Sequence, residues 1–270
     1  MRQQVPPTLD NAVITSAPLA ETTNLIGLLE ELSLNAWPSL RTVHYDGWAL
    51  RFANGYTRRA NSINPVFGST LNVDEKIRYC ETLFEMRGLR PVFKMTPRVY
   101  PDDLDAILKK KWYEEEAPTS VQMLDLNGLD MPTLETAVIS ETLAEQWLNA
   151  YCVLNRVQER HISTLKQILE NIVPRRCFVM LLVDGEPVSV GMGVADRGYI
   201  GLFDIVTDEQ RRGRGLGTQL MLHLLHWGQA NGAARAYLQV MVENTAAQRL
   251  YWKLGFREVY QYWYRVKGSD

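Results

Sequence analysis

The feature that most restricts how this chain can fold is a glycine-rich stretch, Gln210–Thr218, which reads Gln-Arg-Arg-Gly-Arg-Gly-Leu-Gly-Thr. An apolar run at 199–207, typical of a buried strand, precedes it, and apolar residues at helical spacing follow it. The stretch is therefore predicted to be a strand-to-helix turn, in which Gly213, Gly215 and Gly217 let a bulky ligand approach the backbone. A helix that begins there presents unpaired N–H groups and the positive end of its dipole. We expect an anion site, specifically one for a pyrophosphate.

Two common phosphate-binding loops do not match this stretch. A P-loop ends in Gly-Lys-Ser/Thr, and no lysine is present here. A dinucleotide fingerprint reads G-x-G-x-x-G, whereas this stretch reads G-x-G-x-G and has too little chain after it for a doubly wound sheet. Positive charge at the rim of the turn comes from Arg211, Arg212 and Arg214.

The run Arg212-Gly213-Arg214-Gly215-Leu216-Gly217 resembles the acyl-CoA loop of the GNAT superfamily of N-acetyltransferases, whose motif is Arg/Gln-x-x-Gly-x-Gly/Ala. A second signature of that superfamily follows at the expected distance, from Asn244 through Tyr251 to Phe256. The resemblance covers residues 133–270. It implies an α+β acyl-CoA N-acyltransferase fold, a mixed and mostly antiparallel sheet flanked by helices.

The first half of the chain has the same order of predicted elements: strands, helix, strand, helix, strand. After an irregular lead-in at 1–20, we expect a helix capped by Thr22 or Thr23, a hairpin turn at Asp46-Gly47, a strand over 56–63, and a helix capped by Asp74. The first half lacks both signatures. The resemblance therefore implies a tandem arrangement, with a degenerate copy at 1–130 and a GNAT acetyltransferase domain at 131–270.

Composition limits the class of protein. A chain of 270 residues with 46% hydrophobic residues can build one long or two small domains. A net charge of −2 argues against nucleic acid as an obligate partner, and no apolar run has the ~20 residues of a membrane span. The N-terminus has no signal-peptide core, and three widely spaced cysteines predict neither disulfides nor a metal site, so we expect a cytoplasmic protein. His223 and His226 lie one helical turn apart but have no third partner, so we expect no metal.

The resemblance assigns cofactor-binding roles to two segments and one side chain. Backbone N–H groups of Arg212–Gly217 and Thr218 are expected to hold the pyrophosphate of acetyl-CoA. The strand end, Ile205, Val206 and Thr207, is expected to pair with the pantetheine arm and to supply an N–H group to the thioester oxygen. Asn244 is expected to bind the cofactor from the next helix.

Two further residues are candidates for catalysis. Tyr251 matches the superfamily tyrosine that protonates the departing CoA sulfur. The base is open, because Gln239 stands where some relatives have a glutamate. Asp204, an acid within an apolar strand, is our first candidate, and Glu243 and water are the alternatives.

The predicted function is transfer of an acetyl group from acetyl-CoA to a primary amine of a small molecule or peptide, by direct attack in a ternary complex. The alternative is a protein that binds acetyl-CoA or CoA as a sensor without turnover, which the neutral Gln239 keeps open. We expect a monomer or a homodimer. The sequence does not identify the acceptor amine.

Overall fold

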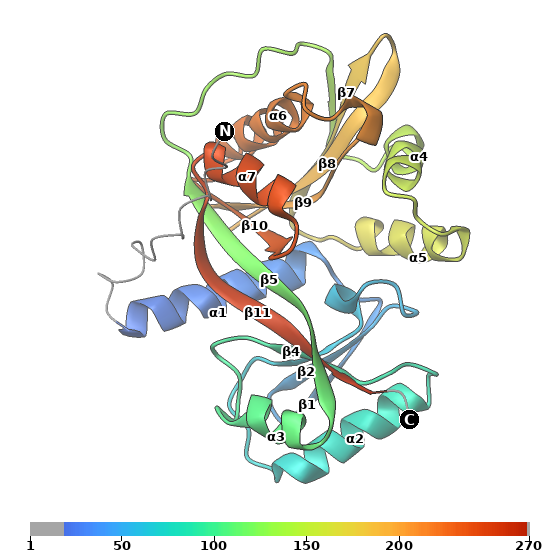
Figure 1. Cartoon of the computed structure of the whole chain (residues 1–270), viewed down its shortest axis with the longest axis vertical. Coiled ribbons are helices and arrows are strands. Elements are labelled where there is room, and N and C mark those ends of the chain that lie inside the picture. Colours follow the sequence, from blue (N-terminus) through green and yellow to red (C-terminus); the bar gives the residue numbers. More distant parts are fainter. Residues whose placement is uncertain (1–18, 269–270) are drawn as a thin grey trace, which may run out of the picture.

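The computed structural model of the protein describes residues 19–268 (Figure 1). Of the lead-in expected at 1–20, residues 1–18 lie outside the described residues, and residues 19 and 20 already belong to the first helix.

Within residues 19–268, eleven strands form one sheet in the order β1-β2-β3-β4-β11-β5-β10-β9-β8-β7-β6. The strands are β1 (Arg41–Tyr45), β2 (Trp48–Phe52), β3 (Ile63–Pro65), β4 (Val92–Met95), β5 (Tyr113–Asp125), β6 (Ala137–Ser140), β7 (Arg175–Val183), β8 (Glu186–Asp196), β9 (Tyr199–Thr207), β10 (Arg235–Met241) and β11 (Arg257–Lys267). The helices are α1 (Leu19–Ala36), α2 (Val73–Glu85), α3 (Leu104–Lys110), α4 (Glu145–Leu154), α5 (Glu159–Glu170), α6 (Leu216–Ala230) and α7 (Thr245–Lys253). The β3–β4 and β9–β10 pairs are parallel and the other neighbours antiparallel, which confirms the mixed, mostly antiparallel α+β sheet.

The two halves of the chain exchange strands at the middle of the sheet. The last strand, β11, lies between β4 and β5 of the first half, and β5 lies between β11 and β10 of the second half. On either side of β11 and β5, the next two strands form a parallel pair, β4 with β3 and β10 with β9. The two halves therefore repeat one arrangement. Figure 1 shows β5 and β11 as two long strands that run side by side between the lobes. A fragment of residues 133–270 would therefore lack both strand neighbours of β11.

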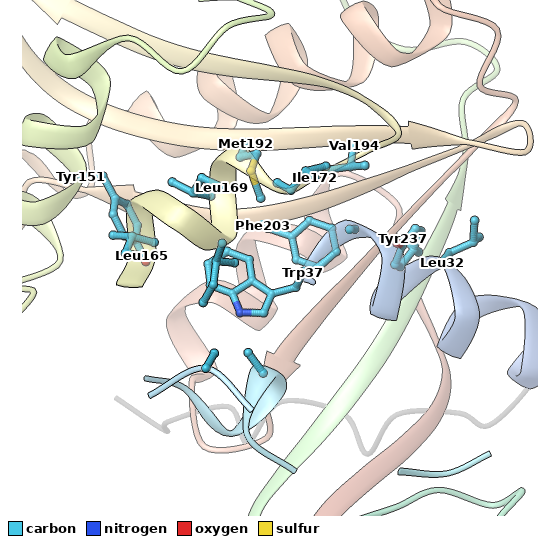
Figure 2. Packing of buried hydrophobic residues seen from close by; sticks show 14 of the residues in the cluster. Leu32, Trp37, Tyr151, Leu165, Leu169, Ile172, Met192, Val194, Phe203 and Tyr237 are labelled. Atoms are coloured by element: carbon cyan, nitrogen blue, oxygen red, sulfur yellow. The ribbon is translucent and has the colours of Figure 1, made fainter. Parts of the chain in front are cut away.

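Hydrophobic clusters cover both faces of the second half of the sheet, because alternate residues of a strand point to opposite faces. In β7, Phe178 joins a cluster with α1, α4 and α5, which we call the shared cluster, whereas Val179 joins a cluster with α6 and α7, the α6 cluster. The shared cluster contains residues of both halves. Figure 2 shows Trp37, from the first half, next to Phe203 of β9.

One segment of the first half differs from its predicted structure in a way that matters for the site. Residues 56–63 do not form one strand, because the segment folds back through a 3₁₀ helix, Arg58–Ala60, before β3 begins. Asn61 causes this turn: its side-chain oxygen accepts hydrogen bonds from the N–H groups of Ala53 at 2.7 Å and Gly55 at 3.0 Å.

Two predicted helix caps are also wrong. Asn72, not Asp74, caps α2, since its side chain accepts hydrogen bonds from the N–H groups of Asp74 at 3.0 Å and Glu75 at 3.3 Å. Helix α1 begins before Thr22 and Thr23, so neither residue stands at a cap position.

Candidate functional site

The glycine-rich stretch forms an open turn between β9 and α6, as predicted. The side chain of Asp208 begins the turn by accepting a hydrogen bond from the N–H group of Gln210 at 3.0 Å. Gly213 and Gly215 both have a φ of +79°, in the left-handed region that favours glycine, and Gly215 immediately precedes α6.

The backbone N–H groups of residues 212–218 donate to no protein acceptor in the described part of the chain. The first hydrogen bond of α6 runs from the N–H group of Gln219 to the carbonyl of Gly215, at 3.0 Å. The first turn of α6 contains no acidic residue, and Gly215 offers no side chain as a cap. This run of free donors at the positive end of a helix dipole suits an anion with several oxygens.

The arginines at the rim differ in how far they are neutralised. Arg211 approaches Asp208, and Arg212 approaches Glu209, each at 3.8 Å. Arg214 has no carboxylate within 4.0 Å among residues 19–268, so its charge is available to a ligand.

The third glycine of the motif serves helix packing. A Cβ on Gly217 would lie 3.1 Å from Cδ2 of Leu250 in α7, so the missing side chain lets α6 and α7 come close. Thr218 follows in the first turn of α6, at the end of the run of free N–H groups.

The parallel strands β9 and β10 separate beside this turn. Their pairing runs from Tyr199 and Arg235 and ends at Leu202 and Leu238, although both strands continue beyond that point. The register of β9 against β8 shifts in the same place, and Asp204 there has a φ of +55°. A β-bulge at Asp204 therefore bends β9 away from β10 and leaves backbone N–H and C=O groups facing the gap.

A cavity of about 430 Å³ opens where the strands separate. Both halves of the chain line it: Thr57, Arg58, Arg59, Ala117 and Thr119 come from the first half, and Tyr151, Asn155, Leu202, Phe203, Asp204, Ile205, Val206, Leu238, Gln239, Val240, Met241, Asn244, Tyr251, Tyr262 and Tyr264 from the second. The predicted residues Asp204, Ile205, Val206, Asn244 and Tyr251 are thus brought together. Thr207 lies at the end of β9, where its hydroxyl is 2.8 Å from that of Ser189.

Tyr251 belongs to the α6 cluster and reaches the cavity from α7. Burial raises its pKa to about 12, so the phenol keeps its proton at neutral pH and can donate it. Asn244 caps the same helix, because its side-chain oxygen accepts a hydrogen bond from the N–H group of Ala247 at 3.2 Å. The amide nitrogen of Asn244 makes no protein hydrogen bond within the described residues, which leaves it for a ligand.

Asp204 lies on the opposite face of the sheet, against Tyr151 of the shared cluster and Arg59 of the first half. Its side chain is 2% exposed, and its Oδ1 atom pairs with Nη2 of Arg59 at 3.4 Å. Its Oδ2 atom is buried without a hydrogen-bond partner. Burial raises the pKa of Asp204, against the opposing effects of Arg59 and Tyr151.

Gln239 is fixed in place by hydrogen bonds at both ends of its side chain. Its Nε2 atom donates to the hydroxyl of Ser33 at 2.8 Å, and its Oε1 atom accepts from the hydroxyl of Tyr262 at 3.0 Å. A neutral amide with both ends engaged has no capacity to take a proton from a substrate.

Several residues that line the cavity were not predicted. Arg58 and Arg59 lie in the 3₁₀ helix just before Asn61, in a segment that the sequence indicated as a strand. Tyr151, Tyr262 and Tyr264 come from α4 and β11, where each resembles an ordinary core aromatic. No local signal marks any of the five, because the cavity forms only when distant segments meet.

The matching cleft of the first half, beside the β3–β4 pair, is filled. Helix α1 packs into it, and its space of about 20 Å³ is room for roughly one water molecule. Lys94 and Glu30 form a buried ion pair there, with Nζ and Oε2 2.6 Å apart. The helix that follows, α2, has Asn72 as a cap and acidic residues in its first turn, so its N-terminus does not favour an anion.

The two histidines of α6 bind backbone rather than a metal. The Nε2 atoms of His223 and His226 lie 2.8 Å and 2.9 Å from the carbonyl oxygens of Leu134 and Asp130. Across residues 19–268, no group of three or more His, Cys, Asp or Glu side chains is arranged to hold a metal ion. None of the described helices is both long and apolar enough to span a membrane.

Comparison with known proteins shows the family to which the chain belongs. The family described as "Probable histone acetyltransferase Rv0428c C-terminal" matches residues 23–265. The chain is also 29% identical, over 244 residues, to the "Uncharacterized N-acetyltransferase YobR" of Bacillus subtilis (strain 168). This match covers 88% of this chain and 97% of that protein.

Solved structures show the same fold at low identity. A GCN5-related N-acetyltransferase from Kribbella flavida is similar with a TM-score of 0.67 and 15% identity, covering 90% of this chain and 96% of that one. A tandem GNAT protein from the clavulanic acid biosynthesis pathway is similar with a TM-score of 0.58 and 12% identity, covering 93% and 96%. The fold is therefore a tandem acyl-CoA N-acyltransferase fold with a degenerate first copy. The chain is a GNAT-superfamily acetyltransferase and belongs to the family of the probable histone acetyltransferase Rv0428c C-terminal region.

Proposed function

We propose that the protein transfers the acetyl group of acetyl-CoA to a primary amine by direct attack in a ternary complex. The observation that carries this proposal is the separation of β9 from β10 at the Asp204 bulge, directly beside the free N–H groups of residues 212–218. An extended thioester can lie in the gap between the strands while its pyrophosphate rests on the turn.

In this proposal the backbone performs most of the cofactor binding. The N–H groups of 212–218 and the guanidinium of Arg214 hold the pyrophosphate. The open edge of Ile205–Thr207 pairs with the amides of the pantetheine arm, as an added strand would. A backbone N–H group at the bulge donates to the thioester oxygen as negative charge develops there. The side-chain amide of Asn244 contacts the cofactor from α7.

The chemical step uses the two faces of the sheet. The amine nitrogen attacks the thioester carbon from the side of the shared cluster, and a carbon–nitrogen bond forms as the carbon–sulfur bond breaks. Tyr251, on the face of the α6 cluster, gives its proton to the leaving thiolate. The proton that the amine loses goes to the Oδ2 atom of Asp204 once the acceptor draws Arg59 away from that carboxylate. The alternative acceptor of this proton is a water molecule in the cavity.

Release of CoA thiol in the presence of an amine library tests the proposal. We expect at least one primary amine to raise thiol release above the rate without amine, with an acetylated amine detected by mass spectrometry. Binding of acetyl-CoA with no amine-dependent thiol release across the library would favour the sensor alternative. The neutral Gln239, whose side chain is hydrogen-bonded at both ends, supports that alternative.

A further inference from the structure

Two consecutive arginines of the first half line the acceptor side of the cavity. The Asn61 turn directs Arg58 and Arg59 into the cavity, where their side chains are 40% and 31% exposed. Arg59 stacks on Trp37, with Cζ 4.3 Å from the ring centroid, which places it beside the bulge. Arg58 lies farther out, 6.0 Å from the ring of Tyr264.

No carboxylate along this wall is free to receive a cationic substrate. Asp204 is the one carboxylate among the described residues that line the cavity, and it is buried against Arg59. Glu116, which pairs with Arg58, lies outside the lining. A polycationic amine or a lysine-rich peptide would therefore meet two guanidinium groups and no carboxylate that is free of an ion pair.

Hydrogen-bond donors, in contrast, are in excess on this wall. Within residues 19–268, the guanidinium of Arg59 makes one hydrogen bond, to Asp204, and that of Arg58 makes one, to Glu116, although each guanidinium carries five N–H donors. The buried hydroxyl of Tyr264 has no hydrogen-bond partner either. Planar guanidinium groups with spare N–H donors are suited to a carboxylate or a phosphate.

We propose that the acceptor is a small amine that carries an acidic group, a carboxylate or a phosphate, and that Arg58 and Arg59 bind this group. The inference rests on the proposed acetyl transfer and specifies its acceptor class. An acid that engages Arg59 competes with Asp204 for that guanidinium and so exposes the Asp204 carboxylate to the amine. The neighbouring positive charges also favour the neutral form of the amine, which is the form that attacks.

Matched acceptors that differ only in the acidic group test the proposal. β-Alanine is compared with propylamine, and O-phosphoethanolamine with ethanolamine, by kcat/KM from CoA release at saturating acetyl-CoA. We expect one acid-bearing amine to exceed its acid-free partner by roughly 10-fold or more, the effect of a charge-assisted hydrogen bond. The pair that shows the effect identifies the preferred acidic group as a carboxylate or a phosphate. The proposal would be overturned if a lysine peptide or an acid-free amine had a kcat/KM equal to that of both acid-bearing amines.

Two substitutions with opposite expected effects connect the preference to these arginines. Arg58→Gln should bring the ratio of acid-bearing to acid-free kcat/KM close to one. Glu116→Gln, which removes the negative charge paired with Arg58, should lower the KM of the acid-bearing amine. Arg175→Gln is the control, because Arg175 forms an exposed pair with Glu141 away from the cavity and should leave the ratio unchanged.

A binding measurement separates this inference from the proposed function. Calorimetric titration of the CoA-saturated protein with the same four amines should detect binding of the acid-bearing amine and weaker binding in Arg58→Gln. If no amine raises thiol release, acetyl transfer fails as the function, but the titration still decides the acidic-group site. Equal binding of acid-bearing and acid-free amines would refute the site, whether or not turnover occurs.

Discussion

Substitution of Gly215 by valine isolates the role of the glycine turn. Gly215 has a φ of +79°, and a Cβ placed there would meet no atom within 4 Å. Valine at this position therefore creates no clash within the protein, and its cost in stability is that of the left-handed backbone, about 1–2 kcal/mol. Its side chain would instead occupy the space in which we place the pyrophosphate. We expect CoA affinity to fall roughly 10-fold or more, equivalent to one charge-assisted hydrogen bond.

Gly198→Val is the matched control for this experiment. Gly198 has the same φ of +79° and equally open surroundings, but it lies in the turn between β8 and β9, outside the cavity. Chemical denaturation should show similar losses of unfolding free energy for the two variants, and calorimetry should show lost CoA affinity for Gly215→Val alone. A folded Gly215→Val protein with unchanged CoA affinity would refute the reasoning, as would an equal loss of affinity in Gly198→Val.

Four further predictions follow from the site and its counterpart in the first half. Tyr251→Phe should bind acetyl-CoA normally but turn over about 10²–10⁴-fold more slowly, as expected for a lost acid; a wild-type rate would exclude the hydroxyl as the proton donor. If Asp204 is the base, activity should fall as the pH drops through the pKa of its carboxyl, which burial raises above the ordinary value of 3.8. Asp204→Asn should be slow and should lack this acidic limb of the pH–rate profile. A limb that tracks the acceptor's own pKa, with Asp204→Asn fully active, would instead leave water as the base. Calorimetry of the whole chain should give one CoA per protein, because the first-half cleft is filled and α2 is capped; two equivalents would contradict this. Lys94→Met should lower the unfolding free energy by about 3–5 kcal/mol, because it leaves the Glu30 carboxylate buried without its ion-pair partner. The double variant with Glu30→Gln should recover part of this loss, and an additive loss would contradict the prediction.

The sequence by itself determined the features that depend on neighbouring residues. The apolar run of β9, the turn with Gly213 and Gly215, and the helical spacing of α6 together predict a strand, an anion-binding turn and a helix, because these elements form through local contacts. The signature from Asn244 to Tyr251 likewise lies within one helix and its cap. Local hydrogen bonds also explain the failures: at Asn61 and Asn72, one side chain decided where a turn or a helix begins.

The tertiary structure alone decided what surrounds the reacting atoms. Asp204 and Arg59 are 145 positions apart, and Gln239 and Ser33 are 206 apart, so no periodicity or motif connects them. The bulge that opens the cleft is a property of β9 against β8, and the exchange of β5 and β11 joins the halves into one sheet. These features depend on strand register and on packing between distant segments. Each such contact becomes favourable only after the chain has closed the long loop between its partners, which a sequence pattern does not record.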